Sequence, residues 1–408
     1  MSRDVFALNL RHLRAVLAVA RLGSVSAAAS EINLSQPALT QGLAQLERQL
    51  GQPLFDRRPD GMTATPAGGI LAARMEASAQ HLAEAMRHIR RGAAGGFMRP
   101  DRLITMVQVR ALIALRKEGG FVSAANATGL SQPALHRAVR DVERLCGVML
   151  VERRGRGVAM TEAGLRLARA FRLAIGEIAA AIADMQALDG TDGGRIAIGA
   201  MPLARARLLP TAVADFHRAF PGVALDIAEG SHSELIEPLR DGELDILVGA
   251  LRDPAPGADV EQVPLFTDRL AVFARAGHPL REAGQPSIAT LAAYPWLIAR
   301  AGTPLRGHWE ALFTTAGMPV PQVMIECGSV MMLRGLLLEG DFLTLLSPDQ
   351  VALEVEAGML AMVGAPLTDT RRVIGLTTRT GWRPTASQAR FIDLLKARSA
   401  DYILPETE

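Results

Sequence analysis

Apolar positions in the N-terminal part of the chain follow the spacing of amphipathic helices. They recur every three or four positions over residues 10–20, which predicts a first helix. Ser26 is placed to cap a short alanine-rich helix over residues 27–32. Ser35 is placed to cap a third helix, which continues through regularly spaced leucines as far as Leu50.

The segment after the third helix predicts a β-hairpin. "PLFDRRPDGMTATPAG" (residues 53–68) contains an apolar run, an arginine-bearing turn and a second short strand. Helix, short helix, tight turn, helix and hairpin are together the element order of a winged helix-turn-helix.

The whole pattern occurs a second time, 96 positions further along the chain. "LSQPAL" stands at residues 34–39 and again at residues 130–135, and the match extends in both directions without a gap. Such a register indicates a duplicated unit, named copy 1 and copy 2 below. Copy 2 has Val122 in place of the Ser26 cap, and its turn has Gly129, which adopts the left-handed conformation more easily than Asn33.

A stripe of apolar residues follows each hairpin at alternating steps of three and four. This is the a/d pattern of paired helices, and we expect the two linker helices to pair within one chain across the flexible "RGAAGG" connector (residues 91–96). Pairing of like copies between two chains is one alternative, and packing of each helix on its own copy is another. The stripes consist of Ala72, Met75, Ala79, Leu82, Met86 and Ile89 in copy 1 and of Ala168, Phe171, Ile175, Ile178, Ile182 and Met185 in copy 2.

Beyond a second linker, "DGTDGG" (residues 189–194), strand-like and helical segments alternate. This alternation predicts a parallel sheet with helices on both faces, and about 210 residues suit two such lobes. The predicted strands are "RIAIGAM", "VALDIAE", "LDILVGAL", "LFTDRLAVFAR", "PWLIA", "QVMIEC" and "FLTLLS", and the predicted helices span 203–219, 233–240, 304–316 and 330–338.

The predicted fold class is therefore multidomain α + α/β. Two all-α winged helix-turn-helix domains with linker helices precede a two-lobed α/β effector domain. The expected boundaries are 1–68 for copy 1, 69–96 for its linker helix and connector, 97–164 for copy 2, 165–194 for its linker helix and 195–408 for the effector domain.

Charge divides the chain in the same place. Up to Gly190 there are 25 basic and 16 acidic residues, which leaves 19 basic and 26 acidic residues for the remainder. A basic half joined to an acidic half favours a module that binds a polyanion.

Candidate DNA contacts lie on the third helix and the hairpin of each copy. A helix fits the major groove, where glutamine pairs with adenine and arginine with guanine, and hairpin arginines suit phosphate or minor-groove contact. An exposed polar helix face that is merely solvated is the alternative. The helix positions are Gln36, Thr40, Gln41 and Gln45 in copy 1 and Gln132, His136, Arg137 and Arg140 in copy 2, and the hairpin positions are Arg57, Arg58, Arg153, Arg154 and Arg156.

Two segments resemble the DNA-binding domain of LysR-type transcriptional regulators. They are "GSVSAAASEINLSQPALTQGLAQLERQLGQPLFDRR" with "TATPAG", and "GGFVSAANATGLSQPALHRAVRDVERLCGVMLVERR" with "AMTEAG". The resemblance implies DNA contacts by Gln36, Pro37, Thr40, Gln41 and Arg57, and by Gln132, Pro133, His136, Arg137 and Arg153.

The chain departs from the family pattern in three respects. Family members usually have Ser-Arg where copy 1 has Thr40-Gln41, and Ser where copy 2 has His136, and they normally carry one such domain. Copy 1 is therefore expected to bind DNA more weakly than copy 2.

The C-terminal half resembles the family's effector domain through "GELDILVGAL", and "PLTDTRRVIGLTTR" (residues 366–379) resembles the subgroup that regulates genes of sugar-binding proteins. Ligands of open α/β sheets bind beyond the carboxyl ends of strands, near helix N-termini. Arg300 and these N-termini favour an anionic or hydroxyl-rich, sugar-like effector, although each position could simply cap a loop. The candidates are Met201, Pro202, Ser231, His232, Arg300, Gly302, Thr303, Gly328 and Ser329.

Other functions find little support in the sequence. There is no HExxH, CxxC, GxSxG or P-loop motif, so no catalytic residue, metal ligand or cofactor is predicted. No apolar run is long enough to cross a membrane, and two cysteines exclude a disulfide framework, which together predict a cytoplasmic protein. The expected partners are double-stranded DNA, a small-molecule effector, RNA polymerase and further copies of the chain. A constitutive DNA-organising protein whose C-terminal half only oligomerises is the alternative function.

Overall fold

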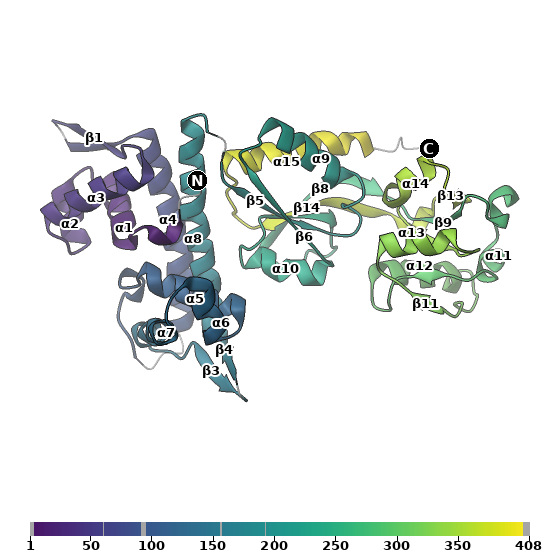
Figure 1. Cartoon of the computed structure of the whole chain (residues 1–408), viewed down its shortest axis with the longest axis horizontal. Helices are drawn as coiled ribbons and strands as arrows, with labels where there is room; N and C mark the ends of the chain where they lie inside the picture. The colour runs from purple at the N-terminus through teal and green to yellow at the C-terminus, as the bar shows by residue number, and fades with distance from the viewer. Residues whose placement is uncertain (1–3, 60, 91–94, 156, 192, 403–408) are drawn as a thin grey trace.

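The computed structural model describes residues 4–59, 61–90, 95–155, 157–191 and 193–402. Its N-terminal half contains one series of elements twice (Figure 1). In copy 1 the series is α1 (Leu10–Leu22), α2 (Val25–Glu31), α3 (Gln36–Leu50), the hairpin β1 (Phe55–Arg58) and β2 (Gly61–Ala64), and α4 (Pro66–Arg90). In copy 2 it is α5 (Met106–Glu118), α6 (Phe121–Thr128), α7 (Gln132–Cys146), the hairpin β3 (Val151–Arg154) and β4 (Gly157–Met160), and α8 (Glu162–Leu188).

The cap of the short second helix lies two residues earlier than the sequence predicts. Ser24, not Ser26, precedes α2, and its hydroxyl accepts a hydrogen bond from the backbone N–H of Ala27 at 3.3 Å. The equivalent residue of copy 2 is Gly120, which has no side-chain cap, so the departure at this helix is Gly120 rather than Val122. Gly129 does take the predicted left-handed conformation, with φ of +69°.

Each hairpin is attached to its own third helix by one glutamate. Glu47 of α3 accepts a hydrogen bond from the backbone N–H of Leu54 at 2.8 Å, and Glu143 of α7 accepts one from Leu150 at 2.8 Å. These carboxylates satisfy backbone donors beside the hairpin that would otherwise remain unpaired. The third helix and the hairpin of each copy are thus joined in the same way.

A glycine at the start of each linker helix permits a close backbone approach. A Cβ atom on Gly68 would lie 1.9 Å from the carbonyl oxygen of Leu54, and one on Gly164 would lie 2.1 Å from that of Leu150. No other residue type fits at these two positions without a shift of the backbone.

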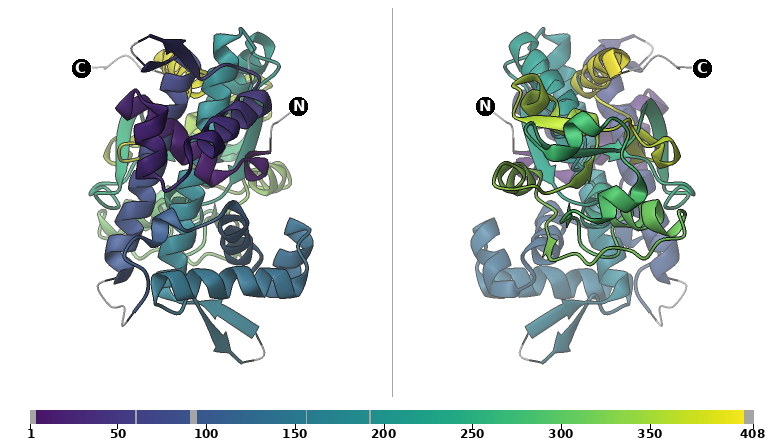
Figure 2. Two further views of the ribbon diagram at one scale, coloured as in Figure 1. Left: turned by 90° about the vertical axis from the view of Figure 1, so that its left-hand side faces the viewer. Right: turned by 90° about the vertical axis from the view of Figure 1, so that its right-hand side faces the viewer.

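The linker helices α4 and α8 pack against each other along their length and lie between the copies and the effector domain (Figures 1 and 2). In this single chain the two linker helices thus pair with each other. Most of the predicted stripe is buried, but Ala79 is exposed and its neighbour Ser78 is buried at 1 % exposure. Residues 91–94 of the predicted connector and residue 192 of the second linker lie outside the described residues.

The first lobe of the effector domain is built on a mixed sheet rather than a fully parallel one. Its strand order is β6-β5-β7-β14-β8, in which β5 is parallel to β6 and β7, whereas β14 is antiparallel to β7 and β8. Helices α9 and α15 cover one face and α10 covers the other (Figure 1). The bounds are β5 Arg195–Ala200, α9 Leu208–Ala219, β6 Ala224–Glu229, α10 His232–Arg240, β7 Ile246–Ala250, β8 Val260–Asp268, β14 Arg372–Arg379 and α15 Ala386–Ser399.

The second lobe combines an antiparallel sheet of order β12-β9-β13 with the parallel pair β10-β11. The predicted strand "LFTDRLAVFAR" is in fact two strands, because the chain leaves the first lobe after β8 and enters the second with β9. The predicted helix over residues 203–219 begins only at Leu208. The bounds are β9 Ala271–Arg275, α11 Ile288–Ala292, β10 Leu297–Ile298, α12 Pro304–Thr314, β11 Ile325–Glu326, α13 Val330–Leu338, β12 Thr344–Leu346, α14 Ala352–Glu356 and β13 Leu360–Val363.

Within the described part of the chain, no helix combines the length and the apolar character that a bilayer span requires. The same residues contain no group of three His, Cys, Asp or Glu side chains placed to hold a metal ion.

Candidate nucleic-acid interface

Helix α7 of copy 2 presents a cationic face. Ser131 caps it by accepting a hydrogen bond from the backbone N–H of Ala134 at 3.3 Å, and Pro133 fits in the first turn, where no donor is needed. The apolar face of α7 is buried in the core of copy 2, so the opposite face is turned to solvent. The exposed polar residues on that face include Gln132, Arg137 and Arg140.

His136 is held in place by an aromatic neighbour. Its ring stacks on that of Phe121 in α6, with the ring centroids 3.6 Å apart and the planes at 13°. The ring is therefore half-buried rather than fully projecting, as the DNA-contact prediction assumed. The equivalent pair in copy 1 is Thr40 and Val25, which cannot stack.

Helix α3 of copy 1 has the same architecture and a neutral face. Ser35 caps it through the backbone N–H of Ala38 at 3.4 Å. The hydroxyl of Thr40 donates to the carbonyl oxygen of Gln36 at 3.0 Å, so it is already used within the helix. The predicted contact residues Gln36, Pro37, Gln41 and Gln45 are exposed.

The hairpin arginines Arg57, Arg58, Arg153 and Arg154 are exposed. None of them has an ion-pair partner among the described residues, and Arg156 lies outside that part of the chain. Charges that are not neutralised within the protein remain available to neutralise phosphates. The two hairpins point away from each other at opposite ends of the pair of copies (Figures 1 and 2).

One buried cation was not predicted from the sequence. Arg74 of α4 is 8 % exposed and contacts Glu177 at 3.0 Å and Asp184 at 2.9 Å, both on α8. It also donates to the backbone carbonyl oxygen of Arg383, just before α15, at 2.9 Å. A charged residue within an otherwise apolar helix face was the only sequence signal of this contact.

Burial raises the pKa of Glu177, but the neighbouring His81 and the hydrogen bond donated by Arg74 outweigh that effect, so the pKa of this carboxyl is lowered from its ordinary value. Glu177 is therefore ionised at neutral pH and holds both neighbours to α8.

Sequence comparisons identify both halves of the chain. The family described as bacterial regulatory helix-turn-helix protein, lysR family, matches residues 10–69 and again residues 106–165, and the LysR substrate binding domain matches residues 189–400. The chain belongs to the LysR family of transcriptional regulators. It is a DNA-binding regulator, and regulators of this family bind an effector in the substrate-binding domain.

Its relatives are themselves regulators. The HTH-type transcriptional regulator GalR of Pseudomonas putida is 33% identical over 378 residues, covering 93% of this chain and 94% of the relative. The SDS degradation transcriptional activation protein of a Pseudomonas species is 37% identical over 282 residues, covering 67% of this chain and 90% of the relative. The solved structure of full-length LysG from Corynebacterium glutamicum has the same fold, with 22% identity, a TM-score of 0.53 and coverage of 72% of this chain and 98% of that one.

In this LysR-type chain the predicted effector residues form two sets. Parallel pairing of β5 with β6 brings the loops after these two strands together, and pairing of β10 with β11 does the same in the second lobe. Within the described residues, no hydrogen bond or ion pair joins one set to the other. The first set is Met201, Pro202, Ser231 and His232, and the second is Arg300, Gly302, Thr303, Gly328 and Ser329.

The first set contains one unpartnered group and one core residue. Nε2 of His232 is shielded from solvent and has no hydrogen-bond partner among the described residues. Burial, assisted by Arg252 and Arg240, lowers the pKa of His232. Met201, by contrast, is 4 % exposed and packs in the core with Leu235, so its side chain is not available at the surface of the lobe.

The opposite end of α10 contacts the DNA-binding half. Asp241 lies 2.6 Å from Nε of Arg169 on α8 and 3.3 Å from Arg116 on α5, and Arg169 also contacts Glu237 at 2.7 Å. A single short helix therefore has its first residues beside the predicted effector loops and its last residues against copy 2.

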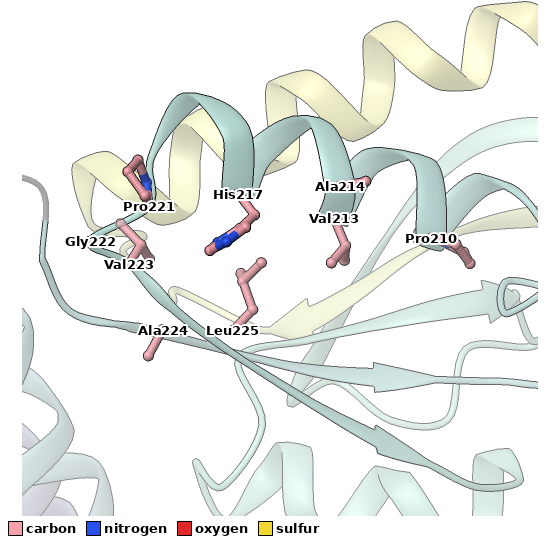
Figure 3. Close-up of a pocket in the computed structure, with 9 residues that line it drawn as sticks. All are labelled: Pro210, Val213, Ala214, His217, Pro221, Gly222, Val223, Ala224 and Leu225. Carbon is pink, nitrogen blue, oxygen red and sulfur yellow. The ribbon is translucent and has the colours of Figure 1, made fainter.

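Neither of two pockets in the effector domain includes a predicted effector residue. One is a groove of about 750 Å³ between α9 and β6, lined by Val213, His217 and Leu225 among others (Figure 3). The other, of about 770 Å³, lies where the lobes meet and is lined by Arg207, Phe266 and Asp349 among others. Burial raises the pKa of Asp349 to about 6.

Proposed function

We propose that both copies are winged helix-turn-helix domains and that they act as one DNA-binding pair within a single chain. The observation that carries the proposal is the packing of α4 on α8 together with the exposed faces of α3 and α7. We call α3 and α7 the reading helices, because they are the helices proposed to enter the major groove. In the family, two chains supply one such helix each. Here one polypeptide supplies both, because a short tether favours the intramolecular contact.

The two kinds of arginine have different roles in this proposal. Arg137 reads a base from the major groove, and Arg153 on the hairpin contacts the DNA backbone. Arg137→Ala should relax specificity at one base position and lower the binding free energy by about 1–3 kcal/mol. Arg153→Ala should weaken binding to all sequences and reduce by about 1 the slope of log affinity against log salt concentration. Equal effects of both variants on every sequence would contradict these roles.

In this proposal, α10 couples effector binding to the DNA-binding half of the chain. An anionic or sugar-like molecule bound between the lobes contacts the loops around His232 and Arg300, and a shift of α10 then moves the charged contacts of Asp241 with copy 2. The coupling requires that the effector bind the two arrangements with different affinity. The result is a change in the spacing or bend of the bound DNA and in recruitment of RNA polymerase.

Titration tests the sensor role. Candidate anions and sugars should raise the melting temperature of the full chain and change its DNA footprint, and Asp241→Asn should leave the melting shift while reducing the footprint change. If no small molecule altered either property, the constitutive DNA-organising alternative would be favoured.

Further copies of the chain associate through the effector domain in this proposal, because α4 and α8 already occupy each other. The apolar groove between α9 and the edge strand β6 is the contact surface we assign, since an edge strand has unpaired backbone groups. Leu225→Lys at this groove should lower the oligomeric state in sedimentation experiments. If the variant sedimented with the mass of the wild type, the chains would associate through a different surface.

Footprinting tests the central proposal. Wild-type chain should protect two neighbouring half-sites, and Gln41→Ala and Arg137→Ala should each weaken protection of a different one. Loss of both half-sites with either variant, or protection of only one half-site by the wild type, would contradict a tandem reading pair.

A further inference from the structure

The two reading helices present different chemistry on the same backbone. Positions 41 and 137 are equivalent, and they are Gln41 and Arg137. Positions 44 and 140 are likewise equivalent, and they are Ala44 and Arg140. Gln41, Arg137 and Arg140 are exposed, Ala44 is half-buried, and neither arginine has an ion-pair partner among the described residues.

These differences select different bases. Arginine pairs with guanine through two acceptors in the major groove, whereas glutamine pairs with adenine. Two extra cations near the groove also make the contact of copy 2 more dependent on phosphate charge and on salt. Copy 1 therefore favours adenine-containing half-sites, and copy 2 favours guanine-containing ones.

The packing of α4 on α8 gives the orientation of the two copies. His81 and Glu177 are equivalent residues, 96 positions apart, and they lie 3.9 Å from each other. Arg74 lies seven residues before His81 and contacts Asp184, which lies seven residues after Glu177, at 2.9 Å. The helices are therefore antiparallel about a local twofold axis near His81 and Glu177. Reading helices related in this way fit half-sites in inverted orientation.

The side chains at this contact break the twofold symmetry. The counterpart of the Arg74–Asp184 ion pair would join Ala170 to His88, which cannot form one. Pairing of two α8 helices about the same axis would place Glu177 against Glu177 in a largely buried position, and like charges there are costly. Copy 2 is thus matched to copy 1 and not to a second copy 2.

We propose that one chain recognises a non-palindromic operator, made of two unlike half-sites in inverted orientation, one adenine-bearing and one guanine-bearing. This inference rests on the tandem reading pair proposed above. The constant order of the halves along the DNA gives the regulator a direction, which a symmetric pair of domains cannot provide.

Selection from random DNA tests the inference. Full-length protein is incubated with duplexes that contain a random window of about 30 base pairs, close to three helical turns, and bound duplexes are sequenced over several rounds. Two adjacent, unlike half-motifs in one fixed order support the inference. Adjacent half-motifs that are inverted copies of each other would contradict the inference but would still agree with a tandem reading pair. Failure to enrich any motif would contradict the proposed function as well.

A variant with matched reading faces sharpens the test. Gln41→Arg with Ala44→Arg gives copy 1 the two cations of copy 2 on the reading face of α3, where Gln41 is exposed and Ala44 is half-buried. The adenine-bearing half-motif should change toward the guanine-bearing one. The control Glu76→Gln with Gln80→Arg adds the same charge at exposed positions of α4 and should raise general affinity without changing either half-motif. If the control changed the motif equally, general charge rather than base readout would explain the result and the inference would be wrong.

Discussion

Copy 1 and copy 2 share the main contacts that hold each copy together, and they differ on part of the exposed face of the third helix and at the contact between the linker helices. The glutamate that attaches the hairpin, the serine that caps the third helix and the glycine that starts the linker helix are the same in both. Gln41 and Ala44 of α3 correspond to Arg137 and Arg140 of α7, and Arg74 and His81 of α4 correspond to Ala170 and Glu177 of α8. A duplicated domain can thus change some of its contacts without changing the order of its helices and strands.

The largest expected effect tests the shared architecture. Gly68→Ala and Gly164→Ala each introduce a Cβ atom about 2 Å from a carbonyl oxygen, so each should destabilise its copy by about 3 kcal/mol. Urea midpoints of the full chain measure the loss. Gly69→Ala is the matched control, since a Cβ there meets nothing within 4 Å and alanine favours the helix by up to about 1 kcal/mol. If the two substitutions lowered the free energy of unfolding by different amounts, the close backbone contact would not have the same importance in both copies.

The contact between the linker helices comes next. Arg74→Ala leaves Glu177 and Asp184 without their cation, and breaking such a pair costs about 3 kcal/mol when it is buried. We expect a lower urea midpoint and faster hydrogen exchange in α4 and α8. Arg87→Ala, on the exposed side of α4, should cost less than about 0.5 kcal/mol, and a similar loss from both variants would show that Arg74 has no special role.

The same contact predicts a dependence on acid. Because the pKa of Glu177 is lowered in the folded chain, its contribution is complete above the unfolded value of about 4.3 and is lost as the pH falls through the folded value. Glu177→Gln should therefore cost about 1–2 kcal/mol at pH 7, with a smaller difference from wild type at acidic pH. Urea unfolding at neutral pH and below pH 4 measures this, and a difference independent of pH would rule out the carboxylate as its source.

The smallest effect concerns the caps of the short second helices. Ser24→Ala removes a hydrogen bond to the backbone of α2 and should cost about 1 kcal/mol. Gly120→Ser gives α6 the cap that copy 1 already has and should stabilise copy 2 by a few tenths of a kcal/mol. Thermal unfolding resolves the first change and, with replicates, the second; a destabilised Gly120→Ser chain would mean that the two helix starts are not equivalent.

The sequence by itself determined the repeat, the order of helices and hairpins in both copies and the division into a basic and an acidic half. Some of these features depend on residues that are close together in the chain, such as a serine directly before its helix (Ser35 before α3 and Ser131 before α7). The repeat depends on a constant spacing of 96 residues between equivalent positions. The exposure of Arg137, Arg57, Arg58, Arg153 and Arg154 could be predicted for the same reason.

Only the tertiary structure decided which charges meet. Arg74 reaches Glu177 across 103 positions, and Asp241 reaches Arg116 across 125, and nothing local marks either pair. It also decided that residues 265–275 belong to two lobes and that Ala79 faces solvent, because a strand's sheet and a helix's partner are set by packing between distant segments. The local pattern of apolar residues specifies elements, whereas the contacts that orient one copy against the other exist only once those elements pack.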